Sequence, residues 1–141
     1  MKTCPKMQKV IEALAEKHNV DLRKSGAYLK LTMDCYMPLV IENTGGCVSV
    51  AHYYEQNGDL CCDPDVVFFI GYDKWVPVEI QYPLMYQRVA DITYKNGKWE
   101  IFQFKSKSMN KIGDFAEQWA QNIHDQGWLA EGASDDDDSR I

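Results

Sequence analysis

The sequence predicts an α+β fold, in which an antiparallel meander sheet of about six to eight strands is flanked by an N-terminal and a C-terminal helix. Two segments, one at each end of the chain, repeat apolar residues every three to four positions, as helices do. Between them lie about eight short apolar or alternating segments, several of which are joined by two-residue turn signals. Because no helical pattern separates these strands, the βαβ alternation of a parallel sheet is excluded.

The first predicted helix begins near the N-terminus, where Thr3 can cap it and Pro5 fits its first turn. His18-Asn19 ends it, and its apolar stripe consists of Met7, Val10, Ile11 and Leu14. The last predicted helix is weakened in its first turn by Gly113 and closed by Gly127. Its stripe runs over three turns and consists of Ile112, Phe115, Ala116, Trp119, Ala120 and Ile123.

The strands between these helices are predicted at 28–33, 38–44, 47–55, 60–63, 66–71, 76–82, 86–95 and 98–105. The pairs Gly45-Gly46, Asn57-Gly58 and Asn96-Gly97 favour tight hairpins, because their residues tolerate a positive φ. The last of these turns would pair 94 with 99, 92 with 101 and 90 with 103. The continuously apolar segment 66–70 is typical of a central strand that is covered on both faces.

Length and charge indicate how the chain is organised. Its 141 residues suit one domain, predicted over 1–128, followed by an acidic and flexible tail over 129–141. The net charge of −6 argues against general nucleic-acid binding, which needs clustered basic residues. One segment, 95–111, is an exception, since it carries Lys95, Lys98, Lys105, Lys107 and Lys111 against a single acid.

The chain is expected to be cytoplasmic and to have no membrane partner. No stretch approaches 18 uncharged apolar residues, and the N-terminus lacks the apolar core of a signal peptide. The five cysteines are odd in number and contain no C-x-x-C motif, which favours reduced and mostly buried thiols.

The densest polar segment, 52–65, surrounds the Asn57-Gly58 turn. A two-residue turn there would place Tyr54 opposite Cys61 and His52 opposite Asp63, with all four side chains on one face. Such a group could orient a general base, or bind a divalent metal through nitrogen, sulfur and oxygen. The simpler interpretation, which we favour, is a structural histidine at the edge of an apolar face, satisfied by one aspartate. No cofactor is predicted on this evidence.

A second pattern, Pro64-Asp65 followed by Glu79-Ile80-Gln81, resembles the paired-carboxylate signature of restriction-endonuclease-like nucleases. Asp65 and Glu79 could converge on a divalent metal if their strands were adjacent. However, glutamine occupies the place of the lysine that the signature requires. The aromatic residues Trp75, Tyr82 and Tyr86 are candidates for binding a protein partner, with plain core or rim positions as the alternative.

The sequence also resembles an uncharacterised domain family found in proteins of bacteriophages and conjugative elements. The resemblance covers roughly residues 25–125 and includes Met37-Pro38-Leu39-Val40-Ile41-Glu42. Its most specific part is the run His52-Tyr53-Tyr54-Glu55-Gln56-Asn57-Gly58-Asp59, followed by Asp63-Pro64. The resemblance implies an accessory protein of a mobile element and no particular mechanism.

Three hypotheses follow, and the first is favoured. The protein is a non-enzymatic accessory module that binds a protein partner. Alternatively, it is a metal-dependent hydrolase that uses Asp65 with Glu79, or His52 with Asp63. In the third hypothesis it binds nucleic acid through the basic segment 95–111.

Overall fold

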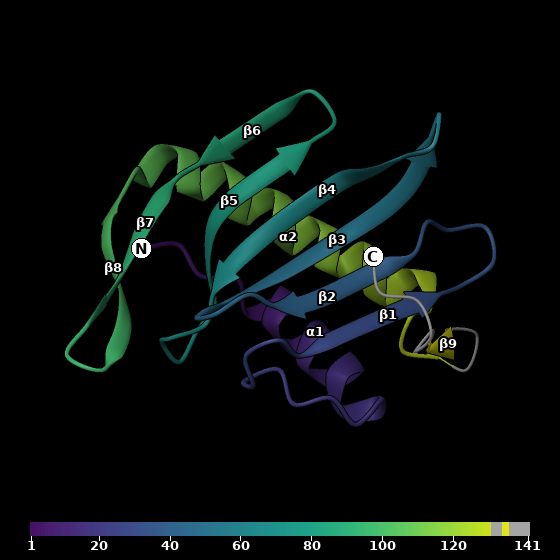
Figure 1. The fold of residues 1–141 in the computed structure, drawn as a ribbon, viewed down its shortest axis with the longest axis horizontal. Helices are drawn as coiled ribbons and strands as arrows, with labels where there is room; N and C mark the ends of the chain where they lie inside the picture. Colours follow the sequence, from purple (N-terminus) through teal and green to yellow (C-terminus); the bar gives the residue numbers. More distant parts are fainter. Residues whose placement is uncertain (131–133, 136–141) are drawn as a thin grey trace.

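The structure is a computed structural model that describes residues 1–130 and 134–135. Two helices, α1 (Pro5–Lys17) and α2 (Ser106–Gln126), accompany nine strands (Figure 1). The strands are β1 (Tyr28–Thr32), β2 (Leu39–Asn43), β3 (Cys47–Gln56), β4 (Asp59–Phe69), β5 (Val76–Tyr82), β6 (Met85–Arg88), β7 (Ala90–Lys95), β8 (Lys98–Phe104) and β9 (Ser134–Asp135).

Six of these strands form an antiparallel meander in the order β6-β5-β4-β3-β2-β1, and β9 pairs with the outer side of β1. Strands β7 and β8 form a separate two-stranded sheet. The predicted α+β class, with a helix at each end of a meander, is confirmed. The helix ends are confirmed as well, because α1 stops before His18-Asn19 and Gly127 ends α2 at a φ of +91°.

The two helices pack against the same face of the sheet (Figure 1). Alternate residues of the strands supply the core beneath them, as in β3, where Val48 and Val50 are fully buried while Ser49 between them is not. The opposite face carries no helix. The prediction that 66–70 lies in a central strand is therefore confirmed, but its covering on both faces is wrong. Val67 points to the open side and stays half-buried.

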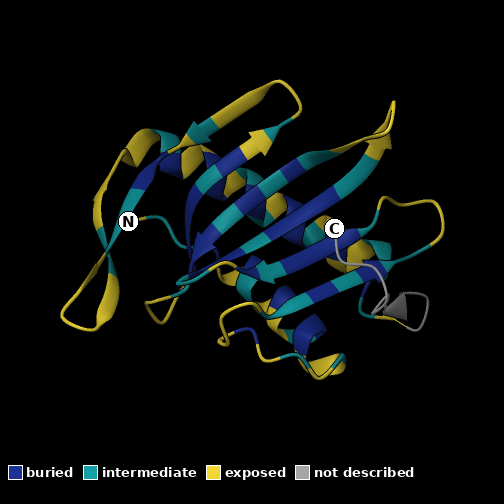
Figure 2. Ribbon diagram, viewed as in Figure 1, coloured by how far each residue is buried: buried dark blue, intermediate teal, exposed yellow. Residues whose placement is uncertain are grey.

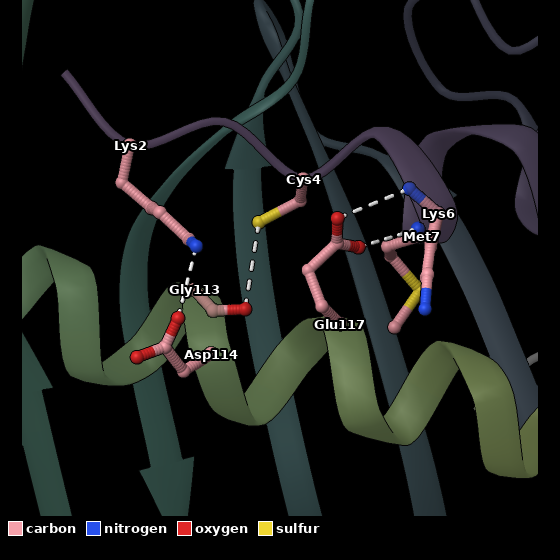
Figure 3. Close-up of polar contacts among 7 residues, drawn as sticks. All are labelled: Lys2, Cys4, Lys6, Met7, Gly113, Asp114 and Glu117. Carbon is pink, nitrogen blue, oxygen red and sulfur yellow. Dashed lines mark hydrogen bonds and ion pairs between the residues drawn. The ribbon is translucent and has the colours of Figure 1, made fainter.

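A carboxylate from α2 caps the N-terminus of α1 (Figure 3). The cap position is Cys4 and not Thr3 as predicted, and no side chain of the segment itself caps the helix. Instead, Glu117 accepts hydrogen bonds from the backbone N–H groups of Lys6 at 3.2 Å and Met7 at 3.0 Å. The first amides of a helix lack partners within it, so this side chain replaces the missing local cap.

Gly113 lets the N-terminal segment cross α2 closely. A Cβ atom at this position would lie 2.4 Å from the Lys2 side chain, whose amino group bonds to Asp114 at 2.9 Å (Figure 3). The glycine that was predicted to weaken the helix therefore serves the contact between the two helical segments.

Three strand predictions need correction. Segments 60–63 and 66–71 are one strand, β4, interrupted by a bulge, and segment 86–95 is divided at Val89 into β6 and β7. The β7–β8 register follows the predicted pairs 94–99 and 92–101 but then shifts, so that Ala90 lies opposite Phe104 and not residue 103. In each case an irregular residue in a strand, which periodicity does not reveal, causes the difference.

Among the described residues, no helix combines the length and apolar character needed to cross a membrane. The predicted acidic tail falls largely outside the described part of the chain, which omits residues 131–133 and 136–141.

Candidate functional site

The open face of the sheet carries a group of polar side chains, which we call the open-face cluster: Ser49, Tyr53, Asp65, Glu79 and Arg88. Strand pairing sets two rows of residues across this face. One row is Glu42, Ser49, Val67, Glu79 and Arg88, and the next is Val40, Ala51, Asp65, Gln81 and Tyr86. Their neighbours along each strand, such as Val50, Val66 and Ile80, point into the core under the helices. The alternation that builds the core therefore also gathers these polar groups.

Asp65 lies half-buried at the centre of the cluster. The Ser49 hydroxyl donates a hydrogen bond of 2.6 Å to its carboxylate. Burial raises the pKa of Asp65, the Ser49 hydrogen bond opposes that effect, and the charges of Glu79 and Glu42 add to it. Asp65 is thus a carboxylate in an environment that disfavours its charge.

Glu79 is balanced by a cation from the neighbouring strand. Arg88 places a guanidinium nitrogen 3.7 Å from the Glu79 carboxylate and bonds to Asp91 at 3.0 Å. The neighbouring Glu79 carboxylate raises the pKa of Tyr86, and burial adds to this effect while Arg88 opposes it. This part of the face is a connected network of charges and hydrogen bonds.

Tyr53 completes the cluster above Asp65. Burial, followed by the charge of Asp65, raises its pKa to about 12, so the phenol is neutral and can donate a hydrogen bond. Acceptors outnumber cations on this face, which suits recognition of donors or cations. Within residues 1–130 and 134–135, no three histidine, cysteine or acidic side chains gather as a metal site would require. The paired-carboxylate hypothesis for Asp65 and Glu79 stays a prediction.

His52 lies on the other face, within the core beneath α2. It stands opposite Leu39 of β2, as expected, and is only 8% exposed. Its Nδ1 lies 3.0 Å from the Met37 carbonyl oxygen and 3.3 Å from that of Pro38. Since a carbonyl only accepts, Nδ1 carries the proton. Burial lowers the pKa of His52, and these two carbonyls oppose that effect.

The predicted register of the β3–β4 hairpin is confirmed as far as the bulge at His52. The pairs Tyr54 with Cys61 and Tyr53 with Cys62 follow the prediction, but Ala51 then faces Asp65. Two residues, Asp63 and Pro64, therefore stand opposite His52 alone, because proline has no N–H for the ladder and marks a bulge. Asp63 acts on His52 through its charge.

The polar residues predicted from the sequence thus separate onto two faces. His52 belongs to the helix side of the sheet, and Asp65 and Glu79 belong to the open face. Tyr54 lies opposite Cys61 on the β3–β4 hairpin beyond the core, and the Cys61 thiol donates toward the Asp59 carbonyl oxygen at 3.9 Å.

The three aromatic candidates differ in exposure. Trp75 is a core residue, 4% exposed, with its ring 5.7 Å from that of Phe68. Tyr82 is half-buried against Phe115 of α2, and Tyr86 is 55% exposed on β6.

Two exposed apolar residues lie directly before Tyr86 in the chain. Leu84 and Met85 are 101% and 45% exposed in the β5–β6 turn and at the start of β6. Pro83-Leu84 between two short apolar strands was the signal available, since an apolar residue in a tight turn has no core to enter.

The comparisons with known proteins identify a family. The model of a family described as "Domain of unknown function (DUF6908)" matches residues 7–129, which includes every element from α1 to α2 apart from the first two residues of α1. The chain belongs to this family. No curated protein matches it significantly, and no solved structure does so.

Proposed function

We propose that this member of the DUF6908 family is a binding module that recognises an extended segment of another protein along the edge strand β6. A strand at the edge of a sheet leaves a row of backbone N–H and C=O groups unpaired, and an added strand can pair with them. The proposal concerns an accessory role and assigns no reaction to the protein.

One observation carries this proposal. Strand β6 ends the sheet, with no further strand among the described residues, and Figure 2 shows β6 and the turn before it as largely exposed. Leu84, Met85 and Tyr86 are consecutive, and their exposed fractions are 101%, 45% and 55%. Edge strands usually carry protective charges or a covering segment, so an apolar edge favours a binding role.

The opposite edge of the sheet shows the difference. There β9 pairs with β1, placing Leu31 opposite Asp135 and Thr32 opposite Ser134. The chain therefore covers one edge with its own strand and leaves the other available. An extended peptide at β6 would repeat the same kind of contact on the second edge.

The sides of β6 suggest what such a segment would meet. Met85 pairs with Tyr82, whose ring contacts Phe115, so one side of an added strand would lie near an apolar surface. Tyr86 and Arg88 point to the open face and offer a ring and a cation to its other side. A segment with alternating apolar and polar residues fits this edge.

The proposed accessory role of the protein rests on a sequence resemblance. The run from His52 to Asp59 resembles proteins of bacteriophages and conjugative elements, which encode many small binding proteins. We include a phage or mobile-element origin in the proposal on that resemblance alone.

Peptide display on the immobilised protein tests the proposal. We expect selected peptides to bind the wild type and to lose about tenfold or more in affinity with the double variant Leu84→Lys/Met85→Lys, because apolar anchors are replaced by charges. Leu60→Lys is the matched control, since Leu60 is 46% exposed on the distant β3–β4 hairpin.

Equal binding of the peptides by both variants would refute a site at β6. Sedimentation of the free protein addresses the other occupant of an open edge. A dimer that Leu84→Lys/Met85→Lys dissociates would show that a second copy of the chain covers β6, and would replace the proposal of a foreign peptide.

A further inference from the structure

The β7–β8 hairpin projects from the body of the molecule as an arm, which we define as residues 90–104 (Figure 1). Its base is buried through Val89 and Ala90, whereas its outer part is largely exposed (Figure 2). Arg88 of β6 bonds to the base of the arm at Ala90 and Asp91, but the proposed function leaves the outer part of the arm unexplained.

The arm carries four aromatic residues, all of them exposed. The exposed fractions are 61% for Tyr94, 38% for Trp99, 71% for Phe102 and 41% for Phe104. Phe102 is the extra residue of the bulge between the pairs Ile92 with Ile101 and Asp91 with Gln103, so no cross-strand partner covers it. Single exposed apolar residues are ordinary, but four exposed rings within eleven positions of one hairpin are unusual.

Basic residues border the same arm. Lys95 and Lys98 face each other at its tip, and Lys105, Lys107 and Lys111 lie at its foot and in the first turns of α2. All five lysines are exposed, and Glu100 is the one acid in this segment. Of the chain's 15 basic and 21 acidic residues, the remaining ten basic and twenty acidic residues lie elsewhere. Residues 95–111 therefore carry five lysines against one acid, although within the arm itself Lys95 and Lys98 are matched by Asp91 and Glu100.

Two contacts fix the arm against the body. A Cβ atom on Gly46 would lie 2.9–3.0 Å from three atoms of the Trp99 indole, so the face of this ring rests on the glycine. The Tyr94 ring packs against Trp99 at 5.1 Å in an edge-to-face arrangement. In addition, Ile101 donates its backbone N–H to the Tyr72 hydroxyl at 3.0 Å. These contacts hold the Trp99 and Tyr94 rings in place before any ligand binds, which reduces the entropic cost of binding at Tyr94.

We propose that the arm binds single-stranded nucleic acid, with bases stacked on Tyr94 and Phe102 and phosphates held by the surrounding lysines. Aromatic rings among cations are the usual means of binding single strands, because every base has a face that can stack. A duplex keeps its bases stacked inside and would use only the lysines. The net negative charge of the rest of the molecule limits the contact to the arm and opposes the broad footprint that a duplex needs.

The proposal differs from what the overall composition indicates about nucleic-acid binding. The net charge of −6 argued against nucleic-acid binding as an average over the chain. Because salt screens charges beyond about 10 Å, a local cluster decides binding more than the total does.

Fluorescence anisotropy with labelled oligo(dT) tests the proposal. We expect binding at about 50 mM salt that weakens with added salt. We expect Tyr94→Ala/Phe102→Ala to weaken it by about tenfold or more. Lys95→Gln/Lys98→Gln should flatten the dependence of log K on log salt by about 1.4, the value for two phosphate contacts on a single strand. Lys9→Gln/Lys24→Gln, which removes two exposed lysines elsewhere, is the matched control for charge and should leave this slope close to that of the wild type.

A pair of glycine variants tests whether the contact between Gly46 and Trp99 contributes to oligo(dT) binding. Gly46→Ala places a methyl group against Trp99, whereas Gly45→Ala meets nothing within 4 Å, and both residues have a positive φ. We expect Gly46→Ala to weaken oligo(dT) binding by more than Gly45→Ala does, because both variants share the backbone strain and only one disturbs the ring.

Three results would overturn the proposal: no binding of oligo(dT) at low salt, equal binding by the Tyr94→Ala/Phe102→Ala variant, or a labelled duplex of the same length bound as tightly as the single strand. Displacement of the oligonucleotide is informative too. If an acidic aromatic peptide bound the arm and oligo(dT) did not compete with it, the arm would be a protein-binding surface.

Discussion

At the scale of single residues, His52 is a polar group that the core holds by two backbone carbonyls and two rings. The indoles of Trp119 and Trp128 lie 5.7 and 5.9 Å from its ring, and its Nδ1–H donates toward Met37 and Pro38. The histidine thereby ties the loop between β1 and β2 to α2 and the segment after it. Burying the neutral imidazole costs little because its N–H has an acceptor, whereas burying the protonated imidazolium costs more because the charge loses its hydration.

His52 leads to a prediction about pH. Burial lowers its pKa in the folded protein below the ordinary value of 6.5, and the carbonyls of Pro38 and Met37 and the Asp63 charge oppose this effect. In the window from about pH 6.5 down to its folded pKa, the unfolded chain binds the proton more readily, so stability falls as the pH falls. We expect urea melts to show this loss between about pH 8 and pH 5.5, and a smaller loss in His52→Gln.

The control for that experiment is His124→Gln, because His124 is exposed near the end of α2. His52→Gln should change the dependence of stability on pH by more than His124→Gln does. Parallel pH profiles for wild type and His52→Gln would contradict the prediction and would leave the histidine with a packing role alone.

The candidate site could be predicted only in part from single residues. Strand alternation correctly placed His52 opposite Leu39, but the bulge that sets both Asp63 and Pro64 opposite His52 was not predicted. Ser49 and Arg88 were missed because neither belongs to a motif, and their roles depend on strands that are neighbours only in the fold. Long-range pairing, more than residue type, decides which polar groups meet.

At the scale of elements, the start of α1 depends on α2. Glu117 supplies the acceptor that a local serine or threonine would otherwise provide, and it does so across more than a hundred residues of sequence. The carboxylate also lies at the positive end of the α1 dipole. The two helices are therefore joined by a polar contact as well as by their apolar stripes.

This contact predicts a measurable loss of stability. Glu117→Ala leaves the N–H groups of Lys6 and Met7 without an acceptor, and the expected cost is about 1–2 kcal/mol in the free energy of unfolding. Glu117→Gln keeps one oxygen and should lose less. Asp114→Asn is the neighbouring control, because the Lys2–Asp114 ion pair is exposed on the Asp114 side and such pairs contribute about 0–1 kcal/mol. Chemical denaturation of the three variants would decide the order, and a larger loss in Asp114→Asn would contradict this account.

The elements themselves were predicted well where their pattern is local. The apolar stripes gave both helices, and the turns at Asn57-Gly58 and Asn96-Gly97 lie between β3 and β4 and between β7 and β8. The division at Val89 was missed, because its N–H bonds to Val78 while its carbonyl accepts from Lys105, and neither partner is near in sequence. The cap from Glu117 was also missed, because Glu117 is far in sequence from the amides that it accepts from.

At the scale of the whole molecule, one layer of helices leaves one face of the sheet open. Small residues such as Ala51 are buried there by their neighbours alone, and the carboxylates of this face lie close enough to affect one another. Glu42 and Glu79 both raise the pKa of Asp65, after the larger effect of burial. The open face thus keeps an unfavourable charge, as binding surfaces often do.

The last prediction concerns this charge. Burial raises the pKa of Asp65 above 3.8, so the folded protein holds this proton more tightly than the unfolded chain does. The free energy of unfolding therefore falls as the pH rises from about 3.8 through the raised pKa. Asp65→Asn keeps an acceptor for Ser49 and removes the charge. We expect this variant to match or exceed the wild type at neutral pH, by about 1 kcal/mol or less, and to lose that advantage as the pH approaches the ordinary aspartate range.

Thermal melts with and without Mn²⁺ would compare this account with the hydrolase alternative. If Asp65 binds no metal, Mn²⁺ should change the melting temperatures of wild type and Asp65→Asn by the same amount. A metal bound only by the folded wild type at a hundred times its dissociation constant would add about 2.7 kcal/mol. Such a shift, absent from Asp65→Asn, would make the carboxylate a ligand. It would then explain in a different way why the open face retains a charge that its own surroundings disfavour.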